Sequence, residues 1–145
     1  MYNDGFTLIE LVVTISILCI LLGLAVLVID ADMFYMDKMA DEFVMDVRYV
    51  QTECMKSTFG NHKISIDINN GCYYIFDNTI IEKTVKFKSR YQIDYSNQNM
   101  ESVGFTYEGI PTNAGTFKIL DTKTDKIREI SIVPATGRTV IRNKQ

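Results

Sequence analysis

The chain has 145 residues, of which 47% are apolar and 23% charged, and its net charge is −3. This length provides for one domain and an appendage, and it excludes two domains that each bury a core of their own. Much of the apolar content lies in the first thirty residues, and the rest of the chain is polar with interspersed Tyr and Phe. The sequence therefore divides into an apolar N-terminal segment and one small globular part.

Charge is also unevenly spread along the chain. Residues Asp30–Glu53 contain seven acids and two bases, whereas residues Lys118–Gln145 contain seven bases and three acids. Two interpretations remain open at this stage. The charges form solvated surface, or they form an acidic stalk and a basic end that meets an anion.

The N-terminal apolar run covers residues 6–29 and reads FTLIELVVTISILCILLGLAVLVI, with Glu10 as its single charge. A helix of this length would extend about 36 Å, which predicts a transmembrane helix. A cleaved secretory signal is the rival interpretation, but its apolar region would be shorter and would follow basic residues. The five residues before Phe6 are MYNDG, without Lys or Arg.

Glu10 requires a partner, because a carboxylate inside an apolar helix costs a few kcal/mol on membrane insertion. Cleavage between Gly5 and Phe6 would create an α-amine four residues before Glu10, on the same face of the helix. That amine is largely protonated at neutral pH. We therefore predict that Glu10 pairs with an N-terminal amine, in its own chain or in a neighbouring subunit, and sets the register of assembly.

The segment Gly5-Phe6-Thr7-Leu8-Ile9-Glu10 resembles the cleavage motif of type IV prepilins, GFTLIE followed by a long apolar helix. The resemblance implies residues 1–5 as a leader, cleavage after Gly5, and N-methylation of Phe6 by prepilin peptidase. The leader departs from the usual pattern because it carries Asp4 instead of a basic residue.

Residues 30–58 are predicted to continue as an amphipathic helix. Its apolar positions recur at spacings near 3, 4 and 7: Met36, Ala40, Phe43, Val44, Val47, Val50 and Cys54. The Met residues are expected to pack against the head rather than to line a binding groove. Gly60-Asn61 is expected to end the helix.

From His62 onward the sequence changes to the two-residue period of β-strands. Lys63–Ile68 alternates, Asn69-Asn70-Gly71 predicts a turn, and Cys72–Phe76 predicts the returning strand of a hairpin. Further strands are predicted at Thr84–Lys88, Tyr91–Tyr95, Val103–Tyr107, Thr116–Leu120, Ile127–Val133 and Thr139–Arg142. The fold class is therefore α+β, with a long N-terminal helix packed on an antiparallel β-sheet head over residues 59–145.

The second half of the chain resembles the minor pseudopilins of the GspH/FimT type. The resemblance rests on FTYEG at Phe105–Gly109, GTFKI at Gly115–Ile119 and ISIVPATGRTV at Ile130–Val140. In that family the head ends in paired strands with Gly-Arg at the final turn, here Gly137-Arg138.

No enzyme motif is present, and we predict neither catalytic residues nor a cofactor nor a metal site. The single histidine, His62, is interpreted as a surface or packing residue, and no Cys/His cluster with metal-ligand spacing occurs. Cys54 and Cys72 would lie outside the membrane, where they could form a disulfide if their Cα atoms came close enough. Cys19 lies inside the apolar run.

The function predicted is that of a minor pilin or pseudopilin subunit of a type IV pilus or type II secretion pseudopilus. Its expected partners are prepilin peptidase, other pilin subunits and, before assembly, membrane lipid. Its expected location is the inner membrane, as a single-pass protein with its head outside, and afterwards the filament.

Two alternatives remain open. In the first, the chain is a DNA-binding minor pilin of a competence pilus, with Arg138, Arg142 and Lys144 neutralising phosphates. The family's basic pattern Gly-Arg-x-Arg is incomplete here, because Val140 occupies the second Arg position. In the second, it is an uncleaved single-span protein with an unrelated adhesive ectodomain.

Overall fold

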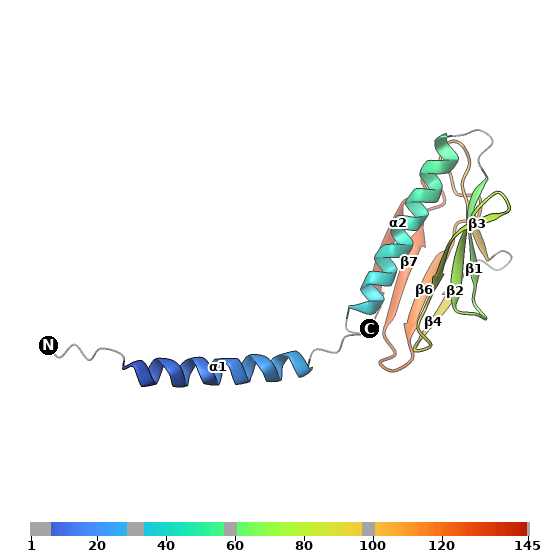
Figure 1. The fold of residues 1–145 in the computed structure, drawn as a ribbon. Coiled ribbons are helices and arrows are strands. Elements are labelled where there is room, and N and C mark those ends of the chain that lie inside the picture. The colour runs from blue at the N-terminus through green and yellow to red at the C-terminus, as the bar shows by residue number, and fades with distance from the viewer. Residues whose placement is uncertain (1–6, 29–33, 57–60, 97–100, 145) are drawn as a thin grey trace. The chain divides into compact units, whose positions relative to one another are not determined.

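The computed structural model describes residues 7–28, 34–56, 61–96 and 101–144, which fall into two compact units, Met1–Phe34 and Tyr35–Gln145. The first unit contains helix α1, Leu8–Val28. The second unit is the head, in which a helix lies against strands (Figure 1); its described residues form one helix and eight strands. Whether the predicted helix continues from α1 into the head is a question about residues 29–33, which lie outside the described residues.

Helix α2, Tyr35–Lys56, is the amphipathic helix predicted over residues 30–58. Its termini differ from the prediction, because Phe34 is in a turn and residues 57–60 lie outside the described part of the chain. The predicted apolar stripe is confirmed, since all its members are buried: Met36, Ala40, Phe43, Val44, Val47, Val50 and Cys54. Met39 is buried with them, whereas Met45 lies on the opposite, exposed side.

The strands of the head form two four-stranded antiparallel sheets. Sheet A has the order β3-β2-β1-β5 and sheet B the order β4-β6-β7-β8. The strand bounds are β1 His62–Asp67, β2 Cys72–Asp77, β3 Ile80–Lys86, β4 Tyr91–Tyr95, β5 Ser102–Gly104, β6 Thr116–Asp121, β7 Ile127–Ile132 and β8 Thr139–Lys144. Every strand predicted from the sequence is present, and β4 has the predicted bounds.

Three features differ from the predictions. The head contains two sheets rather than one, because the chain turns at Lys88–Arg90 and places β4 beside β6 instead of β3. Strand β3 begins at Ile80, four residues before its predicted start. Strand β5 ends at Gly104, since Phe105 continues only as an isolated bridge to Pro111.

The core lies between α2 and the two sheets (Figure 1), and Phe43 is one of its fully buried members. The Phe43 ring is fully buried and stacks on Phe117 of sheet B at a centroid distance of 4.0 Å. The same ring meets Tyr73 of sheet A edge to face at 5.2 Å. The edge-to-face arrangement with Tyr73 is a favourable geometry for an aromatic pair. One helix residue therefore packs against both sheets.

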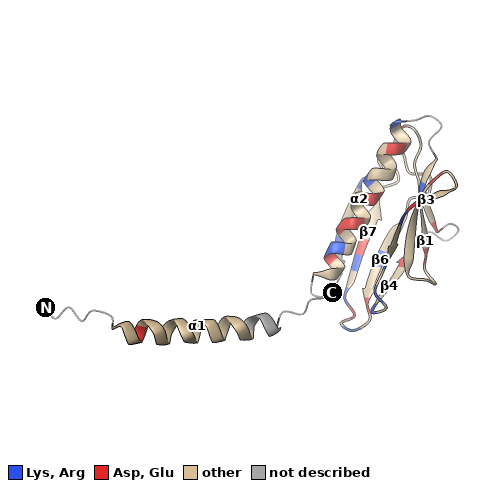
Figure 2. Cartoon of the chain, viewed as in Figure 1, with Lys and Arg blue, Asp and Glu red and all other residues tan. Residues whose placement is uncertain are grey.

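Acidic residues are spaced along α2 (Figure 2), and three of them, Asp37, Glu42 and Asp46, form ion pairs with the sheets. Asp37 pairs with Arg128 of β7, whose Nε donates to Asp37 Oδ1 at 2.6 Å. Asp46 accepts from Tyr73 Oη at 2.7 Å and from Lys83 Nζ at 2.8 Å. Some acids of α2 therefore form ion pairs within the head. These pairs do not decide whether the charge pattern is solvated surface or an acidic stalk with a basic end.

Another ion pair, between Arg90 and the buried Asp121, lies at one end of the β4–β6 ladder of sheet B, where Tyr91 pairs with Asp121. Arg90 donates from Nε and Nη2 to the two carboxylate oxygens of Asp121, each at 2.7 Å. Thr124 Oγ1 and the Lys123 backbone N–H also donate to this carboxylate. The Arg90 guanidinium, although opposed by desolvation, holds the pKa of Asp121 well below its usual range.

Replacing Phe43 with Ala should lower the free energy of unfolding by about 3–5 kcal/mol, because the cavity would open between both sheets and α2. Met45→Ala is the matched control on the same helix, since the Met45 side chain is 68% exposed, and should change stability by less than about 0.5 kcal/mol. Urea denaturation followed by tyrosine fluorescence measures both, as the chain has no Trp. Equal effects would contradict the central role of Phe43.

Replacing Asp121 with Asn should destabilise the head at pH 7, and this difference should shrink as the pH falls below about 4. A carboxyl group whose pKa is lower in the folded state stabilises the fold above its unfolded-state pKa and loses that contribution on protonation. Urea midpoints at pH 7 and pH 3 for both proteins measure the effect. Asp94→Asn, at an exposed position of β4, should show no comparable pH dependence.

Candidate functional site

The first turn of α1 is organised by Thr7 and Glu10. The Thr7 backbone N–H and hydroxyl donate to Glu10 Oε2 at 3.1 and 2.9 Å, and the Glu10 N–H approaches Thr7 Oγ1 at 3.4 Å. This reciprocal arrangement is a capping box, which satisfies N–H groups that lack partners at a helix start. Glu10 therefore has a local structural partner in addition to any partner in assembly.

The sequence signal of this capping box is Thr7-x-x-Glu10, which gives Glu10 a local role beside its predicted pairing with an amine. Gly5 and Phe6, the predicted cleavage and methylation positions, lie outside the described residues, so the pairing of the Phe6 amine with Glu10 stays a prediction. Capping and pairing with an amine are compatible roles for Glu10, because a carboxylate has two oxygens and both capping hydrogen bonds from Thr7 end on Oε2.

The side chains of α1 are apolar around the whole helix, and those from Leu8 to Leu24 are largely exposed in the isolated chain. None of the helices in the described part of the chain meets the requirements of length and apolarity for a membrane span. The transmembrane helix predicted over residues 6–29 is therefore not confirmed by the structure.

The three predicted DNA-binding residues belong to the final turn and strand of the head. Arg138 and Arg142 are exposed, and the side chain of Lys144 lies outside the described residues. Arg142 lies directly opposite Glu129 of β7, which in turn lies opposite Lys118 of β6. Acids and bases thus alternate across this face of sheet B, so Arg142 does not belong to a uniformly basic surface.

Gly137, the residue before Arg138, has a structural role. Its φ is +66°, and an added Cβ would lie 2.5 Å from Gln51 Nε2 and 2.9 Å from the Gly109 carbonyl oxygen. Gln51, on α2, donates to the carbonyl oxygens of Gly109 and Thr136 at 2.8 and 3.3 Å. The Gly-Arg turn is therefore packed against α2 by one amide side chain, and only glycine fits there.

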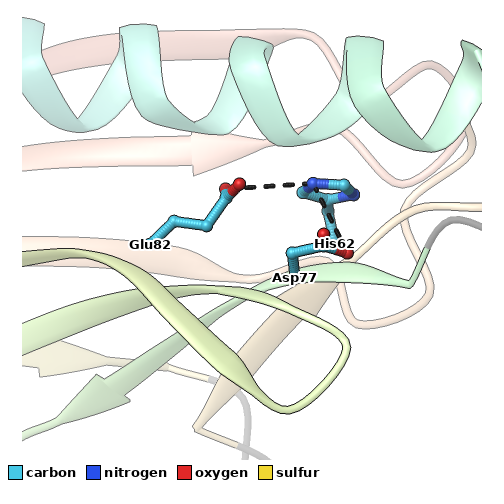
Figure 3. A group of neighbouring side chains, drawn as sticks. All are labelled: His62, Asp77 and Glu82. Atoms are coloured by element: carbon cyan, nitrogen blue, oxygen red, sulfur yellow. Dashed lines mark ion pairs between the residues drawn. The ribbon is translucent and has the colours of Figure 1, made fainter.

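The structure also brings together three residues that the sequence analysis did not connect: His62, Asp77 and Glu82 (Figure 3). One ligand atom from each lies within 4.8 Å of the others. They are 5 to 20 positions apart on three strands, and no sequence motif marks them. The cysteines Cys54 and Cys72 are both buried and unpaired, so the disulfide left open by the sequence is absent.

Residues 1–26 match the prokaryotic N-terminal methylation motif. The solved structure of the minor pseudopilin EpsH from the type 2 secretion system of Vibrio cholerae matches with a TM-score of 0.57 at 12% identity. The match covers 74% of this chain and 94% of EpsH. The chain therefore has the fold of a minor pseudopilin. No curated protein shows a significant match to the sequence.

Both resemblances seen in the sequence are confirmed, the first as a methylation motif and the second as a fold. A prepilin-type methylation motif precedes a head with the minor-pseudopilin fold. At 12% identity the structural likeness concerns the fold alone. A likeness in fold carries no information about whether the basic residues of β8 bind DNA. Neither comparison supports the competence alternative.

Replacing Gly137 with Ala should destabilise the pseudopilin fold more than Gly71→Ala. Gly71 has a similar φ of +61°, but an added Cβ there meets nothing within 4 Å. The Gly71 variant thus reports the backbone strain alone, about 1–2 kcal/mol, and the Gly137 variant should cost about 1–3 kcal/mol more through overpacking. Urea denaturation compares the two, and equal costs would show that the Gln51 contact is unimportant.

Proposed function

We propose that the chain is a minor pilin or pseudopilin subunit that prepilin peptidase processes and that then assembles into a type IV pilus or a type II secretion-like pseudopilus. The observation that carries this proposal is the combination of a methylation motif at residues 1–26 with a minor-pseudopilin fold in the same chain. Each feature alone is less specific. The role is structural, and no catalytic step is assigned to the chain.

Processing is proposed to remove residues 1–5 and to methylate the new N-terminal Phe6. The support is the position of the methylation motif, which spans the Gly5–Phe6 bond and most of α1. The peptidase and the other pilin subunits are the partners this requires. The head, Tyr35–Gln145, contains the whole cluster of buried apolar residues, and the methylation motif ends before it begins.

The apolar side chains of α1 need a non-aqueous environment at each stage. Burying apolar surface contributes about 25 cal/mol per Å², so an uncovered α1 would be strongly unfavourable in water. We propose that inner-membrane lipid covers α1 before assembly, with the head outside, and that α1 helices of neighbouring subunits cover it in the filament.

Glu10 is proposed to contribute its negative charge to this packing, by pairing with the protonated amine of Phe6 in a neighbouring subunit. A charge among apolar helices is stable only when paired, and removing one partner of such a pair costs about 3–5 kcal/mol. This would select one axial register among the many that apolar contacts permit. Both hydrogen bonds that Thr7 donates to Glu10 end on Oε2, so the capping box does not use the second carboxylate oxygen.

Three variants separate the charge of Glu10 from its capping role. Glu10→Ala removes both, Glu10→Gln keeps a side chain that serves a capping box but removes the charge, and Thr7→Ala weakens the cap but keeps the charge. We expect at least about tenfold less of the two Glu10 variants in sheared filaments. Thr7→Ala should assemble at near-normal levels.

Mass spectrometry of the N-terminal peptide in the native host checks that every variant is cleaved and carries a methyl group on Phe6. Normal incorporation of Glu10→Gln would refute the charge-pairing role and leave only the cap. An intact leader in the wild-type protein would refute processing itself and favour the uncleaved single-span alternative. Alkaline extraction of membranes tests the proposed location before assembly.

A further inference from the structure

The residue triplet His62, Asp77 and Glu82 lies where three adjacent strands of sheet A come together. His62 begins β1, and Asp77, at the end of β2, is its direct cross-strand partner, so both side chains lie on the same face. Glu82 lies in β3 at an irregularity of the β2–β3 ladder, where Ile75 pairs with Lys83 and Phe76 pairs with Ile81. Glu82 is the extra residue of this β-bulge.

The bulge explains why Glu82 reaches His62. In a regular strand, neighbouring side chains alternate between faces, but a bulge re-aims one side chain and is over-represented beside functional sites. Lys83 and Glu82 both reach α2: Lys83 binds Glu42 and Asp46, and Glu82 accepts from Tyr49 Oη at 3.2 Å. Lys83, the basic residue next to Glu82 in the sequence, is therefore already paired with two acids of α2.

The geometry is that of ligands around a common centre rather than of direct hydrogen bonds. His62 Nε2 lies 3.8 Å from Asp77 Oδ1 and 3.8 Å from Glu82 Oε2 (Figure 3). These distances are too long for hydrogen bonds. Two ligands that each lie about 2.0–2.2 Å from one Zn²⁺ ion are themselves roughly 3–4 Å apart.

The environment of His62 also lacks the partners that a buried imidazole normally has. Its side chain is only 12% exposed, and the buried Nδ1 atom has no hydrogen-bond partner among the described residues. The other nitrogen faces two carboxylates without contacting either. Two carboxylates that converge on one nitrogen require a cation between them, and a proton on His62 or a metal ion could supply it.

The ligand atoms favour a metal ion of the zinc type. Zn²⁺ binds imidazole nitrogen and carboxylate oxygen, whereas Ca²⁺ takes six to eight oxygen ligands. Two neighbours orient the carboxylates: Tyr49 donates to Glu82, and Asn78 Nδ2 donates to Asp77 Oδ1 at 3.1 Å. Such outer contacts commonly hold ligands in place in metal sites. Asp77 and Glu82 are 40% and 34% exposed, so solvent reaches the site and can complete the coordination.

We propose that His62 Nε2 and the carboxylates of Asp77 and Glu82 bind one divalent transition-metal ion, Zn²⁺, which cross-links β1, β2 and β3. Through Tyr49 the ion would also fix sheet A against the C-terminal half of α2. This inference concerns the head alone and does not depend on the processing or assembly of the N-terminal segment.

The test uses the full chain in detergent, without a histidine tag, after chelator treatment, and with Cys19→Ser in every protein because Cys19 is an exposed thiol. Isothermal titration with ZnCl₂ should show one ion per chain, and Zn²⁺ should raise the melting temperature. Asp77→Asn/Glu82→Gln should weaken binding by more than about tenfold, and Tyr49→Phe by about tenfold. Asp94→Asn, an exposed carboxylate of β4, should bind like the parent.

Because His62 is the single histidine of the chain, its ring signals in NMR report ligation directly. Zn²⁺ should shift these signals in the parent but not in Asp77→Asn/Glu82→Gln, and a folded spectrum of that variant excludes unfolding as the cause. Three results would overturn the proposal: no Zn²⁺ binding, binding that the carboxylate substitutions leave unchanged, or binding of Ca²⁺ in preference to Zn²⁺. The first result, with His62 signals that respond only to pH, would assign the cation to a proton.

Discussion

The packing of α2 against two separate sheets is the constraint on which the rest of the head depends. Sheets A and B have separate hydrogen-bonded ladders, so side chains rather than backbone bonds must hold them together. Phe43 shows how, since its ring stacks on Phe117 of sheet B and meets Tyr73 of sheet A edge to face. Without the helix, each sheet would expose the apolar face that the other cannot cover alone.

Polar contacts along α2 then position the parts of the head that packing leaves undetermined. Asp46 anchors β3 through Lys83, and Gln51 holds the turn that contains Gly137. Tyr49 donates to Glu82 at the bulge of β3. These three residues follow one another along the helix, so a single rigid element orients sheet A, the C-terminal turn and the proposed metal ligands. The positions of β3 and of the turn at Gly137 therefore depend on their contacts with α2, which is distant from both in the sequence.

The chain separates two tasks between its two units. The first unit carries the methylation motif and an apolar helix whose start is capped by Thr7 and Glu10, and it supplies what processing and assembly would need. The second unit is a self-contained head with the minor-pseudopilin fold. In a filament, α1 would be surrounded by other subunits, whereas the surface of the head would distinguish this subunit from its neighbours. The proposed cation site belongs to the head and would affect its stability rather than the filament core.

The sequence by itself determined the secondary structure and the N-terminal motif, because both depend on neighbouring residues. The spacing of apolar residues predicted α2, the two-residue alternation predicted all eight strands, and Gly5–Glu10 indicated the prepilin resemblance. Only the tertiary structure decided the division into two sheets, the packing of Gly137 against Gln51, and the meeting of His62 with Asp77 and Glu82. These depend on which strands pair, in which register and with which bulge. Strand pairing is fixed by contacts between residues that are distant in the sequence, so it cannot be predicted from the local pattern of each strand.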